Sequence, residues 1–435
     1  MNPDVGMRLA QTRAQQPLAD GVGSGLDARS MGWCSWLSRV GPKMACLALA
    51  FAICCICLHP GQARADDAGL GGQVIRVGPG RPIKTLAEAS KRAQAGALVE
   101  VDAGEYLGDV AVWTQDRLTL RAVGGRAKLR AAGAAAEGKA IWVVRANGMR
   151  IEGFDFEGAA VPDRNGAGIR LEKGSLHISD CTFLRNEMGL LTSNDPTAVL
   201  EVENSEFAYN QRPDGHNHNL YVGRIARLTV TGSYFHHARI GHLLKSRAAI
   251  SHIYYNRLTD ETGGTASYEL EFPDGGVAYV MGNLIEQGTG TDNPHLISFG
   301  AEGYKWPRNE IHLVNNTLVD RLPRGGVFLR VAPGADTLRA VNNLLVGGGA
   351  LESAGPGEYR NNFTAEEGDF VQAVAYDYRL KANSRFAGRW SDPGSSNGQN
   401  LQPQREYVHP RNTRPLDGAK HNPGAMQSMA PPSTP

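Results

Sequence analysis

Short runs in which apolar and polar residues alternate recur through the middle of this chain, separated by turns rich in glycine, asparagine and aspartate. Such alternation is typical of strands, whose successive side chains point to opposite faces. Seven runs align on one aliphatic position: Leu171, Leu191, Leu220, Leu244, Leu270, Ile297 and Leu329. If this column points inward, the residue after each member points outward. These outward residues are Glu172, Thr192, Tyr221, Lys245, Glu271, Ser298 and Arg330.

A second phrase recurs with a similar period. In each copy a small or polar residue stands three positions before an aromatic or aliphatic one, and the apolar ends are Phe156, Phe183, Phe207, Phe235, Leu258, Ile285, Leu318 and Leu345. Successive ends are 23 to 33 residues apart. Strand-like runs and turns at this period predict a solenoid of strands. Leucine-rich repeats have a similar period, but their phrase L-x-x-L-x-L does not recur, so we expect a parallel β-helix.

Both ends of the repeat region carry phrases that resemble the pectin-lyase-like β-helix superfamily. At the N-terminal end, a helical stretch begins at Thr85 and is followed by VEVDAGEY, with a Gly-x-Tyr turn at 104–106. At the other end stand DYRLKANS, from Asp377, and HNPGAMQ, from His421. The resemblance covers residues 73–427. It implies an all-β chain folded as a single-stranded right-handed parallel β-helix with an N-terminal capping helix.

The N-terminal segment reads as a leader rather than as part of this fold. Arg39 and Lys43 precede the apolar run MACLALAFAICCICL, and an A-x-A site ends at Ala65. This order predicts a secretory signal peptide cleaved after Ala65, with an uncleaved signal anchor as the alternative. We therefore expect a secreted or periplasmic protein.

Composition adds few constraints on partners. The 45 basic and 44 acidic residues give a formal net charge of +1, so overall charge does not favour nucleic acid as a partner. Cleavage would leave Cys181 as the only cysteine, best explained as a buried side chain, and no internal disulfide is expected. We expect a monomer with no membrane contact after cleavage. The expected divisions are a leader at 1–65, a β-helix at 66–391, and a loop or strap with a disordered end at 392–435.

Polar side chains are densest on the coils around the middle of the outward column, where seven of the 12 histidines also lie. We take Tyr221, Lys245 and Glu271 as candidate catalytic residues because they are consecutive members of that column. The candidate substrate-binding residues around them are Asn219, His218, His242, Arg247, Glu269, His295 and Arg330. The plainer alternative is an exposed ion pair between Lys245 and Glu271, worth at most about 1 kcal/mol.

The order of these residue types suits removal of a proton from a sugar acid. Eliminative cleavage of a uronic acid chain needs a base for the C5 proton, a cation for the carboxylate and an acid for the leaving oxygen. Lys245 would favour the charged form of Tyr221 as the base, and Glu271 would hold Lys245 protonated. Arg247 and Arg330 would bind uronate carboxylates through their planar guanidinium groups. An acidic polysaccharide is the expected partner.

Lys245 and Ser246 resemble the Lys-Ser pair of the chondroitinase B and alginate lyase family. The resemblance implies that the lysine is the base, helped by an arginine on the next coil, and that nearby acidic residues hold calcium. In this chain Glu269 to Glu271 stand where that arginine is expected. Our primary expectation is that no cofactor is required, with Ca²⁺ held by Glu269, Glu271 and Asp274 as the alternative.

Three other functions remain open. Epimerisation at C5 uses the same proton abstraction as elimination. A glycoside hydrolase needs two carboxylates about 5 to 10 Å apart, which Glu269 and Glu271 on one strand would satisfy, although Lys245 and Arg247 would keep both ionised. A non-catalytic polysaccharide-binding or cell-envelope protein would show the polar face without needing Tyr221 or Lys245.

Overall fold

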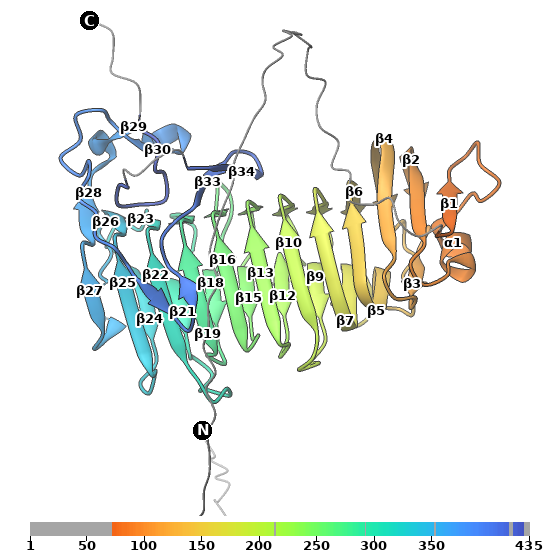
Figure 1. Ribbon diagram of the computed structural model, residues 1–435, viewed down its shortest axis with the longest axis horizontal. Coiled ribbons are helices and arrows are strands. Elements are labelled where there is room, and N and C mark those ends of the chain that lie inside the picture. Colours follow the sequence, from red (N-terminus) through yellow and green to blue (C-terminus); the bar gives the residue numbers. More distant parts are fainter. Residues whose placement is uncertain (1–71, 213–214, 292, 352–353, 417–420, 430–435) are drawn as a thin grey trace, which may run out of the picture. The chain divides into compact units, whose positions relative to one another are not determined.

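The described residues wind into a parallel β-solenoid of about ten turns with only 4% helix, shown in Figure 1. The computed structural model describes residues 72–212, 215–291, 293–351, 354–416 and 421–429. The expected leader, its cleavage site and the expected disordered end of the chain lie outside these residues. Each turn adds a strand to three parallel sheets, which we name sheets 1, 2 and 3. The predicted all-β parallel β-helix is confirmed.

The three sheets share the long strands that pass around a corner of the solenoid. Sheet 1 contains β1 (Val74–Val77), β2 (Leu98–Leu107), β4 (Thr119–Arg130), β5 (Ala140–Glu152), β7 (Ala167–Ser179), β10 (Val199–Glu203), β13 (Arg227–Thr231), β16 (Ile250–Tyr254), β19 (Val277–Met281), β22 (Glu310–Val314), β25 (Thr337–Val341) and β27 (Glu358–Arg360). Sheet 2 contains the second halves of β2 and β4, then β6 (Phe154–Glu157), β8 (Thr182–Leu184), β11 (Glu206–Ala208), β14 (Tyr234–His236), β17 (Arg257–Thr259), β20 (Leu284–Gln287), β23 (Thr317–Asp320), β26 (Leu344–Gly347) and β28 (Phe363–Ala365). Sheet 3 contains β3 (Ala111–Trp113), the first halves of β5 and β7, then β9 (Met188–Thr192), β12 (Leu220–Val222), β15 (His242–Ser246), β18 (Tyr268–Phe272), β21 (His295–Phe299) and β24 (Val327–Val331).

A few short elements lie outside these sheets. They are helix α1 (Leu86–Arg92), the 3-10 turns η2 (Glu367–Asp369) and η3 (Ala373–Ala375), and the antiparallel pairs β29 (Phe370–Gln372) with β30 (Asp377–Leu380), β31 (Ser395–Ser396) with β32 (Gln399–Asn400), and β33 (Arg405–Val408) with β34 (Asn412–Pro415). The hydroxyl of Thr85 accepts a hydrogen bond from the Glu88 backbone at the start of α1. Leu86 and Ala89 of this helix are fully buried in the core, and its role as a cap stays a prediction. Among the described residues, no helix has the length and apolarity needed to cross a bilayer.

A stack of phenylalanine rings shows how the repeated phrase builds the core. Phe156, Phe183, Phe207 and Phe235 point inward from consecutive strands of sheet 2, and their ring centroids are 5.0, 4.5 and 4.8 Å apart. All four side chains are fully buried. Each such burial contributes about 1.5 to 3 kcal/mol. The period of the sequence therefore reflects one inward apolar residue per coil.

Polar side chains form a ladder along the corner between sheets 1 and 2. The members are Cys181, Ser205, Ser233, Asn256, Asn283, Asn316, Asn343 and Asn362. Asn283 shows the pattern: its Oδ1 accepts from the Asn256 backbone at 2.9 Å and from Asn256 Nδ2 at 3.0 Å, while its Nδ2 donates to the Ile253 carbonyl at 2.8 Å. The residue before each member has φ between 48° and 68°, which favours glycine, asparagine and aspartate there.

The strand register confirms the outward column from Tyr221 onward. Tyr221 pairs with Lys245, Lys245 with Glu271, Glu271 with Ser298, and Ser298 with Arg330. These residues are therefore one coil apart, at about 4.8 Å. The strand register therefore places Tyr221, Lys245 and Glu271 side by side, as the column predicts.

The first two members of the predicted column are wrong. Tyr221 pairs with Leu191, and Leu191 pairs with Arg170. Glu172 and Thr192 therefore do not belong to the outward column, and Arg170 and Leu191 take their places. The sequence pattern permitted this error because the runs at 168–173 and 189–194 each contain two aliphatic residues close together.

The C-terminal segment at 391–416 lies against the outer faces of sheets 1 and 2 (Figure 1). Leu401 packs in a cluster with Tyr279 on sheet 1. The Gln404 backbone donates to the Tyr255 hydroxyl at 3.0 Å, and Arg411 Nη1 donates to Thr182 Oγ1 of sheet 2 at 2.6 Å. These contacts leave the outer face of sheet 3 to other segments.

We predict that Asn283→Ala lowers the free energy of unfolding by about 2 to 4 kcal/mol, because buried backbone groups on two coils lose their partners. Urea unfolding followed by circular dichroism measures the change. Gln399→Ala, which removes an amide near the surface, is the control and should cost far less. Equal losses for the two variants would contradict the importance of the ladder.

Candidate functional site

The three candidate catalytic residues lie side by side on the outer face of sheet 3. Tyr221, Lys245 and Glu271 occupy one register on β12, β15 and β18, and the residues before them in each strand belong to the core. Lys245 Nζ forms an ion pair with Glu271 Oε2 at 2.8 Å. The structure therefore brings the predicted catalytic residues into one cluster.

This cluster is more deeply buried than an outward column suggests. The side chains of Lys245 and Glu271 are only 11% and 4% exposed. The loop at 300–309, between β21 and β22, packs on them: Glu302 Oε1 accepts from Lys245 Nζ at 3.1 Å, and Trp306 Nε1 donates to the Arg247 carbonyl at 3.0 Å. Sequence reasoning missed Glu302 because the loop is outside the repeat. Its one signal is the longest repeat interval, 33 residues.

Arg247 follows β15 and connects the hydroxyl of Tyr221 to two carboxylates. Its Nε donates to the Tyr221 hydroxyl at 3.0 Å. Its Nη1 is 2.5 Å from Asp274 Oδ1 and 2.8 Å from Glu302 Oε2. Asp274 is fully buried and also pairs with Arg224 at 2.6 Å. The cation in direct contact with Tyr221 is therefore Arg247, where the sequence suggested Lys245.

Two carboxylates of the cluster, Glu271 and Glu302, are ionised near neutral pH. Burial opposes ionisation of Glu271, but the hydrogen bond from His242 and the charge of Lys245 outweigh it and lower the pKa of Glu271. The hydrogen bond from Arg247 lowers the pKa of Glu302 to about 2. Burial lowers the pKa of His242 below its usual 6.5. The cluster thus holds three carboxylates (Glu271, Glu302 and Asp274), two cations (Lys245 and Arg247) and the neutral imidazole of His242.

Flat side chains form a row beside the cluster. His218 lies 4.5 Å from His242 between ring centroids, His242 lies 5.0 Å from Tyr268, and Tyr268 lies 6.5 Å from His295. The backbone of His242 donates to His218 Nδ1 at 3.0 Å, which fixes that nitrogen as an acceptor. These four residues therefore lie beside the cluster: His218 and His242 are buried, whereas Tyr268 and His295 are partly exposed. Substrate binding by the three histidines stays a prediction.

Asn219 is wrong as a substrate-binding candidate. It is fully buried in a turn. Its Oδ1 accepts from Asn210 Nδ2 at 2.8 Å, and its Nδ2 donates to the His236 carbonyl at 2.9 Å. These bonds use its amide to hold the corner between sheets 2 and 3.

Glu269 is also misplaced by the sequence reasoning, because strand alternation breaks where the chain enters sheet 3. On the adjacent strand β15, the consecutive residues Leu243 and Leu244 both belong to the core. Glu269 on β18 is in register with Leu243, so it also faces inward. Glu269 is 1% exposed, and its Oε1 has no hydrogen-bond partner among the described residues. Burial raises the pKa of Glu269 well above its usual value, and the nearby Asp260 adds to this.

The hydrolase and calcium alternatives both require Glu269 and Glu271 to face the same substrate or ion. Glu269 points into the core whereas Glu271 points outward, so they do not face a common substrate or ion. Asp274 is already paired with Arg224 and Arg247. Within the part of the chain that the structure describes, no group of three or more His, Cys, Asp or Glu residues is arranged to hold a metal ion.

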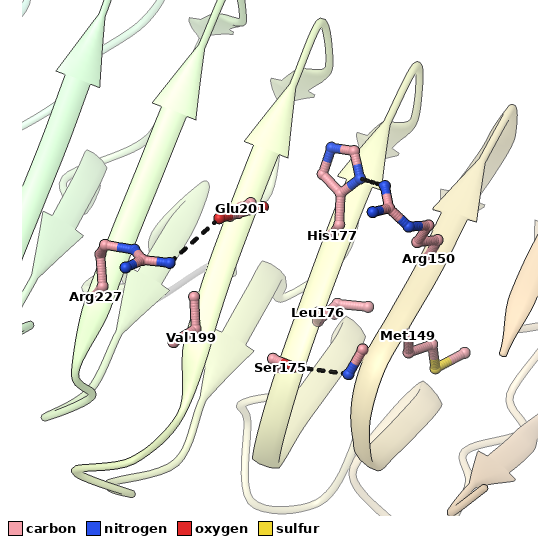
Figure 2. A pocket seen from close by; sticks show the side chains of 9 residues that line it. Met149, Arg150, Ser175, Leu176, His177, Val199, Glu201 and Arg227 are labelled. Atoms are coloured by element: carbon pink, nitrogen blue, oxygen red, sulfur yellow. Dashed lines mark hydrogen bonds and ion pairs between the residues drawn. The ribbon is translucent and has the colours of Figure 1, made fainter. Parts of the chain in front are cut away.

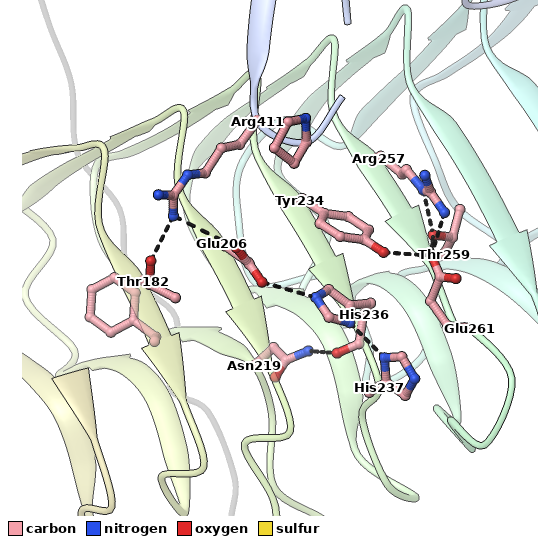
Figure 3. A network of polar contacts seen from close by, with 12 residues as sticks. Thr182, Glu206, Asn219, Tyr234, His236, His237, Arg257, Thr259, Glu261 and Arg411 are labelled. Carbon is pink, nitrogen blue, oxygen red and sulfur yellow. Dashed lines mark hydrogen bonds and ion pairs between the residues drawn. The ribbon is translucent and has the colours of Figure 1, made fainter. Parts of the chain in front are cut away.

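His236 and His237 belong to a separate polar network on sheet 2, shown in Figure 3. His236 bonds to Glu206 at 3.3 Å and to His237 at 2.5 Å. Arg411 of the C-terminal segment lies 3.7 Å from Glu206. The members of this network bind one another and Arg411. The network is therefore best explained as the surface on sheet 2 that holds the C-terminal segment in place. The histidines counted in the sequence therefore do not form one site.

A shallow hollow of about 320 Å³ lies on the outer face of sheet 1, shown in Figure 2. Arg150 contacts His177 at 3.1 Å, and Arg227 pairs with Glu201 at 3.5 Å. The charged side chains of this hollow are exposed and paired with each other. It is the rival surface for a bound polymer, but it lacks the convergence of charges found on sheet 3.

The last sequence candidate, Arg330, lies on β24 at the end of the outward column and is exposed. It has no hydrogen bond or ion pair among the described residues. Its charge helps to lower the pKa of His295, for which burial is the larger cause. Arg330 therefore stays available to a ligand on the face of sheet 3.

No protein-family model matches this chain, and no curated protein matches it in sequence. Among solved structures, the pectate lyase Pel9A is 12% identical with a TM-score of 0.56, covering 82% of this chain and 97% of that chain. A pectin methylesterase from Aspergillus niger is 12% identical with a TM-score of 0.38, covering 68% of this chain and 92% of that chain. At these identities the likeness shows the fold alone. The likeness to Pel9A confirms the right-handed parallel β-helix fold that the sequence resemblance implies.

We predict that Glu269→Gln raises the thermal unfolding midpoint at neutral pH. A carboxyl whose pKa is raised by folding stabilises the fold fully below its unfolded pKa, about 4.3, and this contribution is lost as pH rises toward the folded value. Because glutamine imitates the protonated acid, the gain should grow from mildly acidic to neutral pH. Glu201→Gln, at a more exposed carboxylate on sheet 1, should show no such trend. A Glu269→Gln variant that is less stable at neutral pH would contradict this assignment.

Proposed function

We propose that this chain is a polysaccharide lyase that cleaves a uronic-acid-containing polymer by abstracting the C5 proton on the outer face of sheet 3. The observation that carries the proposal is the position of Glu302. Its side chain is 48% exposed, yet its carboxylate contacts both Lys245 and Arg247. Two cations that converge on a carboxylate at the surface have the chemistry needed to receive the carboxylate of a uronate.

Binding of the uronate carboxylate to these two cations would make the C5 proton more acidic. Abstraction of this proton places negative charge on the adjacent carboxylate, and fixed positive groups stabilise that charge in the transition state. Lys245 and Arg247 are held by Glu271 and Asp274 from behind. Little reorganisation would be needed when the substrate arrives, because these ion pairs already fix both cations.

Tyr221 is the candidate base. Its hydroxyl accepts a hydrogen bond from Arg247 Nε at 3.0 Å, and a guanidinium in that position stabilises a phenolate. The same arginine would then contact the substrate carboxylate and the base, so the proton donor and acceptor would be held together. Lys245, which forms an ion pair with Glu271 at 2.8 Å, is the candidate acid for the leaving oxygen.

Two further observations support a sugar polymer. Tyr268 and His295 are partly exposed and present aromatic rings beside the cluster, and the apolar faces of sugar rings pack against such surfaces. The outer face of sheet 3 is long and periodic, which suits an extended chain. A secreted or periplasmic location, as the N-terminal segment predicts, would give access to such a polymer.

The alternatives differ in their fit to this geometry. A C5 epimerase would use the same residues and is separated from a lyase only by its product. A hydrolase is disfavoured because a general acid needs a raised pKa, whereas the pKa of the outward Glu271 is lowered. A non-catalytic binding protein would keep the carboxylate seat without a need for Tyr221.

Incubation of the full chain with polygalacturonate, alginate and hyaluronate tests the proposal. Elimination raises the ultraviolet absorbance of the new double bond, and we expect this with at least one polymer. Tyr221→Phe and Lys245→Ala should each lower the rate at least about a hundredfold, while Lys128→Ala, an exposed lysine on sheet 2, should not.

Other outcomes separate the alternatives. New reducing ends without the absorbance change would indicate hydrolysis, and inversion at C5 without cleavage would indicate an epimerase. Retained binding without any product would make this a binding protein. An active Tyr221→Phe would remove Tyr221 as the base.

We also predict that Glu302→Gln tightens substrate binding, seen as a lower KM, because the substrate carboxylate no longer competes with an internal one. Mild acid would not have this effect in the native chain, since Glu302 stays ionised until pH approaches about 2. The matched control is Glu105→Gln, a carboxylate of similar exposure that also pairs with an arginine. Weaker binding by Glu302→Gln would contradict this prediction. It would show that Glu302 helps to form the substrate-binding site and does not compete with the substrate carboxylate.

A further inference from the structure

Arg170 belongs to the same outward face as the candidate catalytic residues. The pairing runs from Arg170 to Leu191 and from Leu191 to Tyr221, so Arg170 lies two coils, or about 10 Å, from Tyr221. Leu191 lies between them and packs in a buried cluster with Met188 and Val143, against which the ring of Tyr221 also packs. Val143 pairs with Arg170 from the coil on its other side, so Arg170 lies within an apolar patch beside the candidate catalytic residues.

The guanidinium of Arg170 has no direct hydrogen-bond or ion-pair partner among the described residues. Its Nε is shielded from solvent and has no acceptor there. The nearby Glu172 is engaged by Lys139 Nζ and Arg145 Nε, both at 2.6 Å. Burial lowers the pKa of Arg170, and the charge of Glu172 offsets this effect only in part. A desolvated cation without a partner is costly, and an anion bound there would remove that cost.

Arg330 stands in the equivalent place on the other side of the cluster. From Lys245, Arg170 is three coils away in one direction and Arg330 is three coils away in the other. The two arginines are thus about 29 Å apart along the solenoid, six coils of about 4.8 Å. Both are without partners among the described residues, in contrast to Arg247, which is fully engaged within the cluster.

We propose that Arg170 is a carboxylate-binding subsite, with Arg330 as its counterpart, for a linear polyuronate that lies along the solenoid axis over sheet 3. This inference rests on the proposed function, and it specifies the ligand's direction and its minimum length. One sugar residue is comparable in length with one coil, so carboxylates recur along such a chain at a spacing that can meet both arginines. The planar guanidinium matches a carboxylate with two parallel hydrogen bonds.

Calorimetric titration of the full chain carrying Tyr221→Phe tests this subsite. The probes are saturated octamers and trimers of galacturonate, mannuronate and guluronate, with maltooctaose as the uncharged control. Adding Arg170→Gln should weaken binding of the preferred octamer about tenfold and leave a trimer bound at the cluster unchanged. Arg170→Lys should recover only part of the loss. Lys128→Gln makes the same charge change on sheet 2 and should have no effect.

Thermal unfolding separates binding from structure. Arg170→Gln should keep or raise the unfolding midpoint, because it removes a partly desolvated charge that has no direct partner among the described residues, whereas a structural role for Arg170 predicts a lower midpoint. Unchanged octamer binding by Arg170→Gln, in a chain that does bind or cleave polyuronates, would overturn this inference alone. If no polyuronate is bound or cleaved by the parent chain, the proposed function falls and the subsite falls with it.

Discussion

Coil-to-coil register is the constraint on which the rest of this molecule depends. Each strand bonds to the strand one coil before and one coil after it, and the ladder from Cys181 to Asn362 fixes the corner between sheets 1 and 2. An error of one residue would turn inward side chains outward. Because the register is fixed, residues about two dozen apart in sequence become neighbours. On the outer face of sheet 3 this places Tyr221, Lys245 and Glu271 in one row.

The sequence predicted the architecture because each coil repeats the same physical demands. One inward apolar residue and one turn residue with positive φ per coil leave a visible period, and Phe207 and Gly282 exemplify the two. The neighbouring positions of Tyr221, Lys245 and Glu271 followed from that period alone. The same reasoning failed at Leu191, where adjacent leucines permit two registers.

Other parts of the site could not be read from the period. Alternation breaks at the corner into sheet 3, so Glu269 faces the core although Glu271, two residues on, faces outward. The burial of the cluster depends on a loop that does not repeat, and Glu302 left no sequence signal beyond the length of that loop. The partners of Arg247 come from three segments, which only the folded chain brings together.

The central claim is that a carboxylate-bearing polymer binds along sheet 3 and replaces Glu302 at the two cations. The most direct measurement is a crystal structure of the Tyr221→Phe chain with a bound uronate octamer. The account predicts a uronate carboxylate at Lys245 and Arg247, with Glu302 displaced and the sugar chain running along the solenoid axis. Sugar bound instead in the hollow beside Arg150 on sheet 1 would contradict it.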